Sequence, residues 1–594
     1  MNRTYTYKLV IAWVLTILVL TAGCAGIIQK RPDSASIVIA ETSDVHGALF
    51  PWDFIENKKA DTSLAQIQTW INEQKDAGIT PLLLDNGDIL QGQPTVYYSN
   101  FEAVKDEHLV ASVMNYMDYG AGSVGNHDIE PGHPVFDKIV REFEFPWLAA
   151  NAIDKSTGKP YFKPYTVIKQ KGIKIAVLGL ITPGIPNWLP ENIWEGIEFE
   201  DMVVSAERWV PIIREKENPD LLVGLFHSGV DFTYGGGDEN TPNNENATKL
   251  VALKVPGFDV VFAGHDHAGW NEILDNGVLL LGARNAARTL AVARIDLQWD
   301  KEALKWVKRK QGQIIDVAGL SPDPDYMAAF EPKIDMIKSY VSKKVGTLAS
   351  AISTREAMFG DSAFVDLIHR IQLDITDADI SFAAPLSFDK TIDAGDMFVR
   401  DMFKLYKYEN LLYTMKLSGR EVKDFLEYSY GLWFNQMQNA EDHLMNFKKD
   451  DKGDLIFSPR NNSYETTARY YNYDSAAGIN YTVDVSKPMG ERIAISSMAD
   501  GKPFDMTSEY TIAINSYRGN GGGGHLTRGA GIPKDKLTDR MISSTIKDLR
   551  YFLMKWIEEK GVVTPAAFGN WQVIPGEWWE KAKQKDHEML FGKK

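Results

Sequence analysis

Metal-binding side chains recur in five short clusters, all in the first half of this 594-residue chain. Four clusters follow a short apolar run that is typical of a buried strand. The clusters are Asp44-Val45-His46, Gly87-Asp88, Gly125-Asn126-His127-Asp128, His227 and Gly264-His265-Asp266-His267. Because the ends of parallel strands converge on one crevice, we expect these side chains to lie together. Mixed nitrogen and oxygen ligands suit two divalent cations such as manganese or zinc rather than calcium.

Spacing within the clusters supports a dinuclear site. Asp44 and His46 lie two residues apart, so an extended backbone directs both side chains to one side, and His265 and His267 repeat that spacing. One such pair alone proves little, because polar residues are common where a strand ends. Together the clusters supply two groups of ligands, a carboxylate that can bridge, and a spare histidine for acid work.

The first half of the chain alternates strands and helices, which predicts an α/β layered domain over residues 36–324. Apolar runs predict strands at Ser36–Ala40, Pro81–Leu84, Gly172–Leu180, Asp220–Phe226 and Val260–Ala263. Helical periodicity predicts helices at Asp61–Lys75, Glu102–Met117 and Met202–Lys216.

A linker helix over Asp325–Val345 is expected to lead into a second, α+β domain at residues 346–594, since one core cannot hold a chain of this length. Strands are expected at Ile380–Ala384, Leu411–Leu417 and Tyr510–Asn515, and helices at Ser362–Leu373, Gly419–Tyr430 and Ser543–Lys560. The polar stretch Asn446–Thr467 is typical of an insertion loop.

The start of the chain carries the only cysteine, Cys24. Basic Arg3 and Lys8 precede an apolar run, and Thr21-Ala22-Gly23-Cys24 follows it. This segment resembles a bacterial lipoprotein signal, in which the cysteine is lipidated. We therefore expect a signal peptide at 1–24, a tether at 25–35, and an exported protein anchored to a bacterial membrane, periplasmic or at the cell surface. The alternative is an uncleaved anchor with an incidental cysteine.

The formal net charge of −16 opposes binding to a nucleic-acid polymer or to an anionic membrane surface. A small anionic substrate remains compatible, because bound divalent cations reverse the local field. The membrane is thus expected as a partner only through the lipid anchor, and the oligomeric state stays open.

Further segments accompany the metal clusters. They are Leu84-Asp85-Asn86-Gly87-Asp88, Gln91-Gly92, Pro94, Ala383-Ala384-Pro385, Asn410-Leu411-Leu412, Ser418-Gly419, Tyr471-Asn472-Tyr473-Asp474, Gly478-Ile479-Asn480-Tyr481 and Asn515-Ser516-Tyr517-Arg518. With them, the chain resembles the 5′-nucleotidase superfamily, and most of all its bacterial 2′,3′-cyclic-nucleotide 2′-phosphodiesterase/3′-nucleotidase branch. The resemblance runs from about Ser36 to the end. It implies an α/β/β/α metallophosphoesterase sandwich with mixed sheets and a C-terminal nucleoside-binding domain.

The same resemblance implies roles for the clustered residues. One metal would be held by Asp44, His46, Asp88 and His267, and the other by Asp88, Asn126, His227 and His265. The pair would activate a water that attacks phosphorus. His127 would stabilise the transition state and protonate the leaving oxygen. Glu130 stands where relatives have the aspartate that orients this histidine, and Asp128 is the alternative, unless it only contacts backbone amides.

Tyr473 and Tyr517 correspond to the aromatic pair that sandwiches the nucleobase in relatives, with Tyr471 as an alternative to Tyr473. Base stacking on aromatic rings is favourable for every base, although a tyrosine in an aromatic-rich run is otherwise typical of a core. Arg518 is interpreted either as a substrate contact or as a solvated arginine.

The expected function is hydrolysis of 2′,3′-cyclic nucleotides and 3′-nucleotides to nucleoside and phosphate, at a cleft between the domains. Alternatives are a 5′-nucleotidase or UDP-sugar hydrolase of the same superfamily, and a non-catalytic binding lipoprotein. The glycine-rich segments do not change this expectation. Gly521–Gly524 lacks the Lys-Ser/Thr of a P-loop, and Gly120–Gly125 leads into Asn126-His127 rather than a clean helix.

Overall fold

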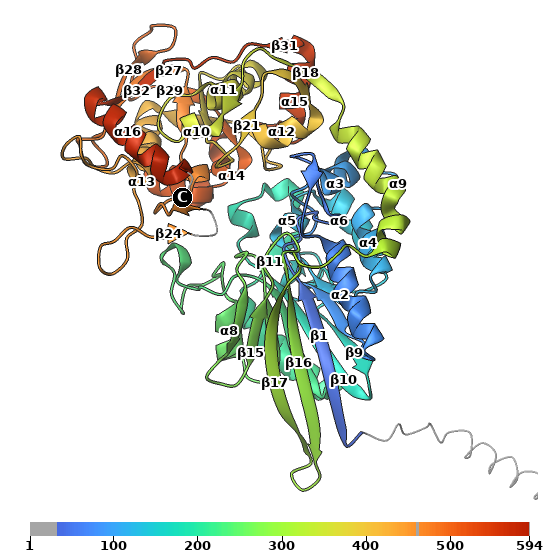
Figure 1. Cartoon of the computed structure of the whole chain (residues 1–594). Coiled ribbons are helices and arrows are strands. Elements are labelled where there is room, and N and C mark those ends of the chain that lie inside the picture. The colour runs from blue at the N-terminus through green and yellow to red at the C-terminus, as the bar shows by residue number, and fades with distance from the viewer. Residues whose placement is uncertain (1–31, 459–461, 593–594) are drawn as a thin grey trace, which may run out of the picture.

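The computed structural model describes residues 32–458 and 462–592. The predicted signal peptide, with Cys24, lies outside these residues. Two units are joined by the long helix α9 (Pro324–Val341), which runs along the side of the molecule from the first unit to the second (Figure 1). Within the part of the chain described, no helix combines the length and the apolar character that a bilayer crossing requires.

The first unit contains two six-stranded mixed sheets. One has the order β17 (Lys305–Asp316), β16 (Thr289–Asp300), β1 (Ser34–Thr42), β4 (Leu82–Asp85), β5 (Ala121–Ser123), β6 (Trp147–Leu148). The other has the order β14 (Trp270–Ile273), β15 (Leu279–Gly282), β13 (Val260–Ala263), β12 (Leu221–His227), β10 (Ile173–Ile181), β9 (Tyr165–Gln170). In the first sheet β1, β4, β5 and β6 are parallel, and in the second β10, β12, β13 and β15 are parallel, while the outer partners pair antiparallel.

Alternation along the strands explains the layering. Ile37 and Ile39 of β1 pack with Val223 of β12 between the sheets, whereas Val38 belongs to the core on the other face of β1. Leu178 of β10 likewise packs on the outer face of the second sheet. The outer layers are α2 (Leu64–Asp76), α4 (Leu109–Tyr116) and α6 (His133–Glu142) on one side, and α7 (Met202–Glu217) and α8 (Thr248–Lys254) on the other. The predicted α/β/β/α sandwich is confirmed.

The second unit is α+β, as predicted. Its main sheet has the order β26 (Ser475–Ala477), β20 (Ile380–Ala383), β29 (Glu509–Asn515), β23 (Leu412–Ser418), β30 (Met541–Ser544). Two smaller sheets have the orders β28 (Ile493–Met498), β27 (Ile479–Asp484), β32 (Trp571–Ile574) and β22 (Gly395–Phe398), β18 (Lys344–Leu348), β31 (Val562–Val563). Its longer helices are α11 (Ala363–Thr376), α12 (Val399–Leu405), α13 (Gly419–Trp433), α15 (Leu549–Lys560) and α16 (Gly576–Phe591).

Smaller elements complete both units. Those that bear on the site are α3 (Pro94–Tyr97), the π-turn Tyr98–Glu102, α5 (Asn126–Ile129), the 3-10 turns Tyr470–Asn472 and Gly522–Gly524, and α14 (Ser516–Gly519). The predicted insertion loop carries the short strands β24 (Phe457–Ser458) and β25 (Ser463–Tyr464).

Three predicted helices differ most from the structure in their limits. Within Glu102–Met117 only α4 is an α-helix. Helix α9 stops at Val341, because the chain enters β18 at Lys344. The predicted helix from Ser543 starts later, since β30 occupies its first residues and Asp548 caps α15 by accepting the backbone N–H of Tyr551.

Buried contacts join the two units. Tyr97 of α3 donates its hydroxyl to Asp548, at 3.0 Å. The Arg550 guanidinium lies over the Tyr97 ring, 4.8 Å from its centroid, and pairs with Glu409 at 3.0 Å. Arg550 is 2% exposed, so this ion pair is shielded from water. The contacts hold the second unit against α3, and the loop between β4 and α3 carries the candidate metal ligand Asp88.

Candidate active site

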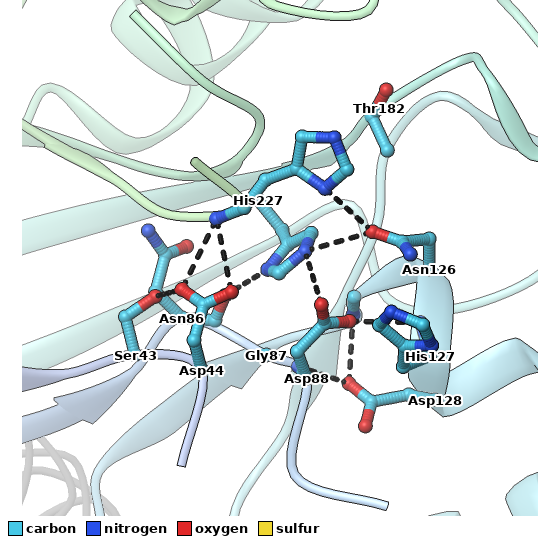
Figure 2. Close-up of polar contacts among 12 residues, drawn as sticks. Ser43, Asp44, Asn86, Gly87, Asp88, Asn126, His127, Asp128, Thr182 and His227 are labelled. Atoms are coloured by element: carbon cyan, nitrogen blue, oxygen red, sulfur yellow. Dashed lines mark hydrogen bonds and ion pairs between the residues drawn. The ribbon is translucent and has the colours of Figure 1, made fainter. Parts of the chain in front are cut away.

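The residues predicted as metal ligands gather where parallel strands of both sheets end. Asp44 and His46 follow β1, Asp88 follows β4, Asn126 follows β5, His227 ends β12, and His265 and His267 follow β13. Figure 2 shows several of these side chains directed toward a common centre. Their candidate ligand atoms form two groups, each within 4.8 Å: Asp44, His46 and His267, and Asp88, His227 and His265. The Asn126 Oδ1 joins the second group, 3.1 Å from His227 Nε2 and 2.8 Å from His265 Nδ1.

The backbone is unusual at these positions. Five of the seven residues have positive φ: Asp44 (51°), His46 (49°), Asp88 (58°), His265 (72°) and His267 (58°). Positive φ is uncommon for residues other than glycine, and such strain concentrates at functional sites. Gly125 makes room for one of them, because a Cβ there would lie 2.3 Å from Asp88 Oδ1. The fold therefore brings the ligand atoms together even though this strains the backbone at several of the positions that carry them.

The donor set fits two divalent cations. The Nδ1 of His46 lies 3.0 Å from a backbone carbonyl oxygen, which can only accept, so Nδ1 carries the proton. The Nε2 of His46 then has a lone pair, which faces His267 Nε2 at 3.0 Å. In the same way His227 donates Nδ1–H to a backbone carbonyl at 2.6 Å, and its Nε2 faces Asp88 Oδ2 at 3.2 Å. Lone pairs and a carboxylate oxygen thus point at one another, an arrangement that a cation between them would satisfy.

His127 lies beside this centre with its own carboxylate partner. Its Nδ1 is 2.6 Å from Glu130 Oε2, and its ring centroid is 5.5 Å from that of His46. Burial lowers the pKa of His127, but the charges of Asp88 and Glu130 together raise this pKa to about 9. The structure therefore places Glu130, rather than Asp128, where it orients a protonated imidazole.

Asp128 does not take the alternative role of orienting His127, because within the described residues its carboxylate bonds backbone amides and the ring bonds Glu130. Its carboxylate accepts the backbone N–H groups of Asp88 (2.9 Å), Ile89 (2.8 Å), Leu90 (3.0 Å) and Gly125 (2.8 Å). Among the alternatives that the sequence left open, the structure shows the loop carboxylate. Asp128 holds the loop that presents Asp88.

Tyr473 is a core residue, which corrects its predicted role in base stacking. It is 2% exposed, and its ring stacks on Trp433 at 5.2 Å and 18° with Phe434 at its edge, 5.5 Å away. Neither face is open to a base. Tyr471 and Tyr517, by contrast, are both half-buried. Burial raises the pKa of Tyr517 to about 12. The groups whose charges act on Tyr517 include Tyr471 of the second unit and Glu245 of the first.

Arg518 is neither solvated nor available to a substrate, so both predicted roles were wrong. It is 1% exposed and pairs with Asp474 through Nε (2.9 Å) and Nη2 (2.7 Å). It also donates to the backbone carbonyls of Tyr471 (2.6 Å) and Gly522 (3.0 Å). Because Arg518 directly follows Tyr517, this network ties the two half-buried tyrosines to each other.

Three residues near the site were missed by the sequence analysis. Glu245 Oε1 lies 3.0 Å from His265 Nε2, and the Trp188 ring stacks on His265 at 5.5 Å and 24°. The charges of Tyr471, Tyr517 and Glu130 act on half-buried Tyr408, whose pKa is raised mainly by burial. Glu245 stands in a polar loop without periodicity, so no spacing signal marks it.

Comparison with known proteins agrees with this arrangement. Residues 37–269 match the calcineurin-like phosphoesterase family, and residues 341–528 match the 5′-nucleotidase C-terminal domain. The trifunctional nucleotide phosphoesterase YfkN of Bacillus subtilis is 28% identical over 92% of this chain, which spans 39% of that protein's length. A 2′,3′-cyclic-nucleotide 2′-phosphodiesterase/3′-nucleotidase of Salmonella typhimurium is 27% identical, with 90% of this chain and 88% of the relative covered. A putative 5′-nucleotidase from Staphylococcus aureus shares the fold, with a TM-score of 0.73, 20% identity, and 91% of this chain and 100% of that one covered.

Proposed function

Because this chain belongs to the 5′-nucleotidase superfamily, we propose that it hydrolyses 2′,3′-cyclic nucleotides and 3′-nucleotides to nucleoside and phosphate. Its class is that of a metal-dependent nucleotide phosphoesterase. The observation that carries the proposal is the convergence of two groups of metal ligands beside the His127–Glu130 pair. The preference for cyclic and 3′-substrates is supported by relatives of that name that match about 90% of the chain.

Two divalent cations, when bound, would lower the pKa of a water and offset charge that develops on the phosphoryl oxygens. The two ligand groups would hold them, with Asp88 as the shared carboxylate. His127 makes its carboxylate contact through Nδ1, which leaves Nε2–H to protonate the leaving oxygen. Glu130 fixes the ring, and its charge adds to that of Asp88 in raising the pKa of His127 to about 9.

The nucleoside would bind in the second unit, with its base between Tyr471 and Tyr517. Stacking contributes about 1–3 kcal/mol per base in comparable sites and tolerates different bases. Arg518 positions this pair through its hydrogen bonds to the Tyr471 carbonyl and to Asp474, and it does not touch the substrate. We also propose that the catalytic domain ends at residue 324 and that the nucleoside-binding domain begins at residue 346. The helix between them lies near a hinge that opens and closes the cleft.

The proposal extends to location. An exported enzyme, lipidated at Cys24 and attached to a bacterial membrane through that lipid, follows from the resemblance of residues 1–24 to a lipoprotein signal. Cys24→Ser should move the full-length protein from the membrane fraction to the soluble fraction of the cell envelope. A variant that remains with the membrane would contradict the anchor.

The deciding experiment follows hydrolysis of 2′,3′-cyclic AMP, 3′-AMP and 5′-AMP by the protein without residues 1–24, with manganese and with chelator. Opening of the cyclic ester is monitored separately, because it releases no phosphate. Metal-dependent ring opening together with 3′-AMP cleavage supports the proposal. Cleavage of 5′-AMP alone assigns the chain to 5′-nucleotidases, and metal binding without any hydrolysis favours a binding lipoprotein.

A further inference from the structure

Glu245 makes one contact that the predicted ligand set does not explain. Its Oε1 lies 3.0 Å from Nε2 of His265, whose other nitrogen, Nδ1, lies 2.8 Å from Asn126 Oδ1. A carboxylate can only accept, so the proton of the imidazole must be on Nε2. The Nδ1 lone pair then faces the group formed with Asp88 and His227.

The backbone around Glu245 is fastened to the end of β12, which carries His227. Its carbonyl oxygen accepts hydrogen bonds from the hydroxyls of Thr182 (3.0 Å) and Ser228 (2.7 Å). The Ser228 hydroxyl also accepts the N–H of Ala247 at 2.8 Å. The position of Glu245 is therefore set by the residue that directly follows His227.

Trp188 restrains the same imidazole from a second direction, by stacking on its face at 5.5 Å and 24°. The side chain of His265 is 14% exposed and that of Glu245 is 35% exposed. A contact that reaches water contributes little to folding stability. Its effect must therefore lie in the orientation and tautomer of the His265 ring rather than in holding the fold together.

We propose that Glu245 is a positioning residue of the metal centre, which fixes His265 with the proton on Nε2 and presents Nδ1 to a divalent cation. The inference rests on the proposed metal site and adds to it a residue outside the ligand set. A carboxylate behind a ligand histidine typically changes metal affinity by about 10- to 100-fold. Of the two cation sites, only the one that contains His265 should depend on Glu245.

The test measures Mn²⁺ binding to the metal-free protein by competition with a fluorescent chelator, and it needs no substrate. Glu245→Ala should weaken one of two sites by about 10- to 100-fold and leave the other unchanged. Glu239→Ala, which removes an exposed glutamate from the same loop, is the matched control and should bind as the wild type does. Wild-type affinity at both sites in Glu245→Ala overturns the proposal.

A double-mutant comparison separates positioning from a general structural role. In the His265→Ala background, Glu245→Ala should cause no further loss of Mn²⁺ affinity, since the effect passes through His265. An additional loss of similar size in that background contradicts the proposal. If Glu245→Ala does not fold, the isosteric Glu245→Gln decides, because a neutral acceptor holds Nε2–H about half as strongly. If Glu245→Gln binds Mn²⁺ with unchanged affinity at both sites, the proposal is overturned. If its affinity is weaker at one site, the proposal is supported.

The binding assay also separates this inference from the proposed function. A wild-type protein that binds two Mn²⁺ ions but cleaves no nucleotide would contradict the function and leave the Glu245 comparison intact. A wild-type protein that binds no divalent cation would overturn both.

Discussion

The metal-ligand region of the first unit and the nucleoside region of the second were predicted from the same sequence with different success. Candidate ligands such as Asp44, Asp88 and His227 lie in two groups at the ends of parallel strands. Tyr473 and Arg518, predicted to contact the nucleoside, instead make their contacts inside the protein. Both regions were defined by residue type and motif, so the difference lies in what each residue type is able to do.

A single histidine or aspartate at a strand end is common, but seven candidate ligands that converge, five of them with positive φ, have few structural uses. Tyrosine and arginine have two uses. The ring of Tyr473 packs on Trp433 as well as it would on a base, and Arg518 pairs with Asp474 as well as it would with a phosphate. Residue type therefore indicates which side chains bind metal, whereas the side chains that stack on a base can be identified only from their positions in the structure.

Asp88→Ala should have the largest effect and would break the comparison if it had none. This substitution removes a carboxylate from one ligand group and the acceptor of the His127 backbone N–H, at 2.8 Å. We expect a loss of bound manganese, measured by elemental analysis after dialysis, together with loss of 3′-AMP hydrolysis. Wild-type metal content in the variant would place Asp88 among the structural carboxylates, with Asp128.

His127→Ala should retain the metals and lose turnover. The imidazole contacts Glu130 and lies beside His46 without belonging to either ligand group. Removal of a general acid typically lowers kcat by about 10²- to 10⁴-fold. Elemental analysis and steady-state kinetics on one preparation separate the two outcomes, and loss of both metals would show that His127 is a ligand.

Tyr471→Ala sharpens the comparison in the second unit. With the base stacked on Tyr471, the loss of about 1–3 kcal/mol should raise KM for 3′-AMP by roughly 5- to 150-fold, with metal content unchanged. Tyr471→Phe keeps the ring and serves as the control. If Tyr471→Ala leaves KM unchanged, the base does not stack on Tyr471, and Tyr473 cannot take its place because it has no free face.

The layered fold was predictable because period-two alternation and short apolar runs directly encode buried strands; β13 has the predicted limits, Val260–Ala263. Helix limits were less accurate where a cap decides them, as Asp548 does for α15. At the site, the neighbours of each ligand were hidden. The contacts of Asp128 with four amides and of Glu245 with His265 link residues 20 or more positions apart in most cases, and local spacing carries no signal for them.

Glu130→Gln tests the carboxylate that the structure selects over Asp128. The negative charge of Glu130 helps to raise the pKa of His127 to about 9. Without that charge this pKa falls, and the protonated acid is lost at lower pH. The alkaline limb of the kcat profile for 3′-AMP should therefore move down by about one pH unit. Asp128→Asn alters no contact of the His127 ring but places an amide NH2 against two backbone N–H groups of the loop, so it should lower kcat and leave the position of the limb unchanged. A shift of the limb in that variant but not in Glu130→Gln would reverse the assignment.

Tyr473→Phe should have the smallest effect, and its sign distinguishes a core residue from a substrate contact. The Tyr473 hydroxyl is buried without a hydrogen-bond partner in the described part of the chain. Removing an unpaired buried hydroxyl relieves a desolvation cost of about 1–3 kcal/mol, partly offset by lost packing, so the apparent Tm should stay the same or rise by a few degrees. KM for 3′-AMP should not change, because the ring that stacks on Trp433 is retained and no face of it reaches the cleft. A rise in KM with an unchanged Tm would return Tyr473 to the nucleoside site and remove the contrast between the two regions.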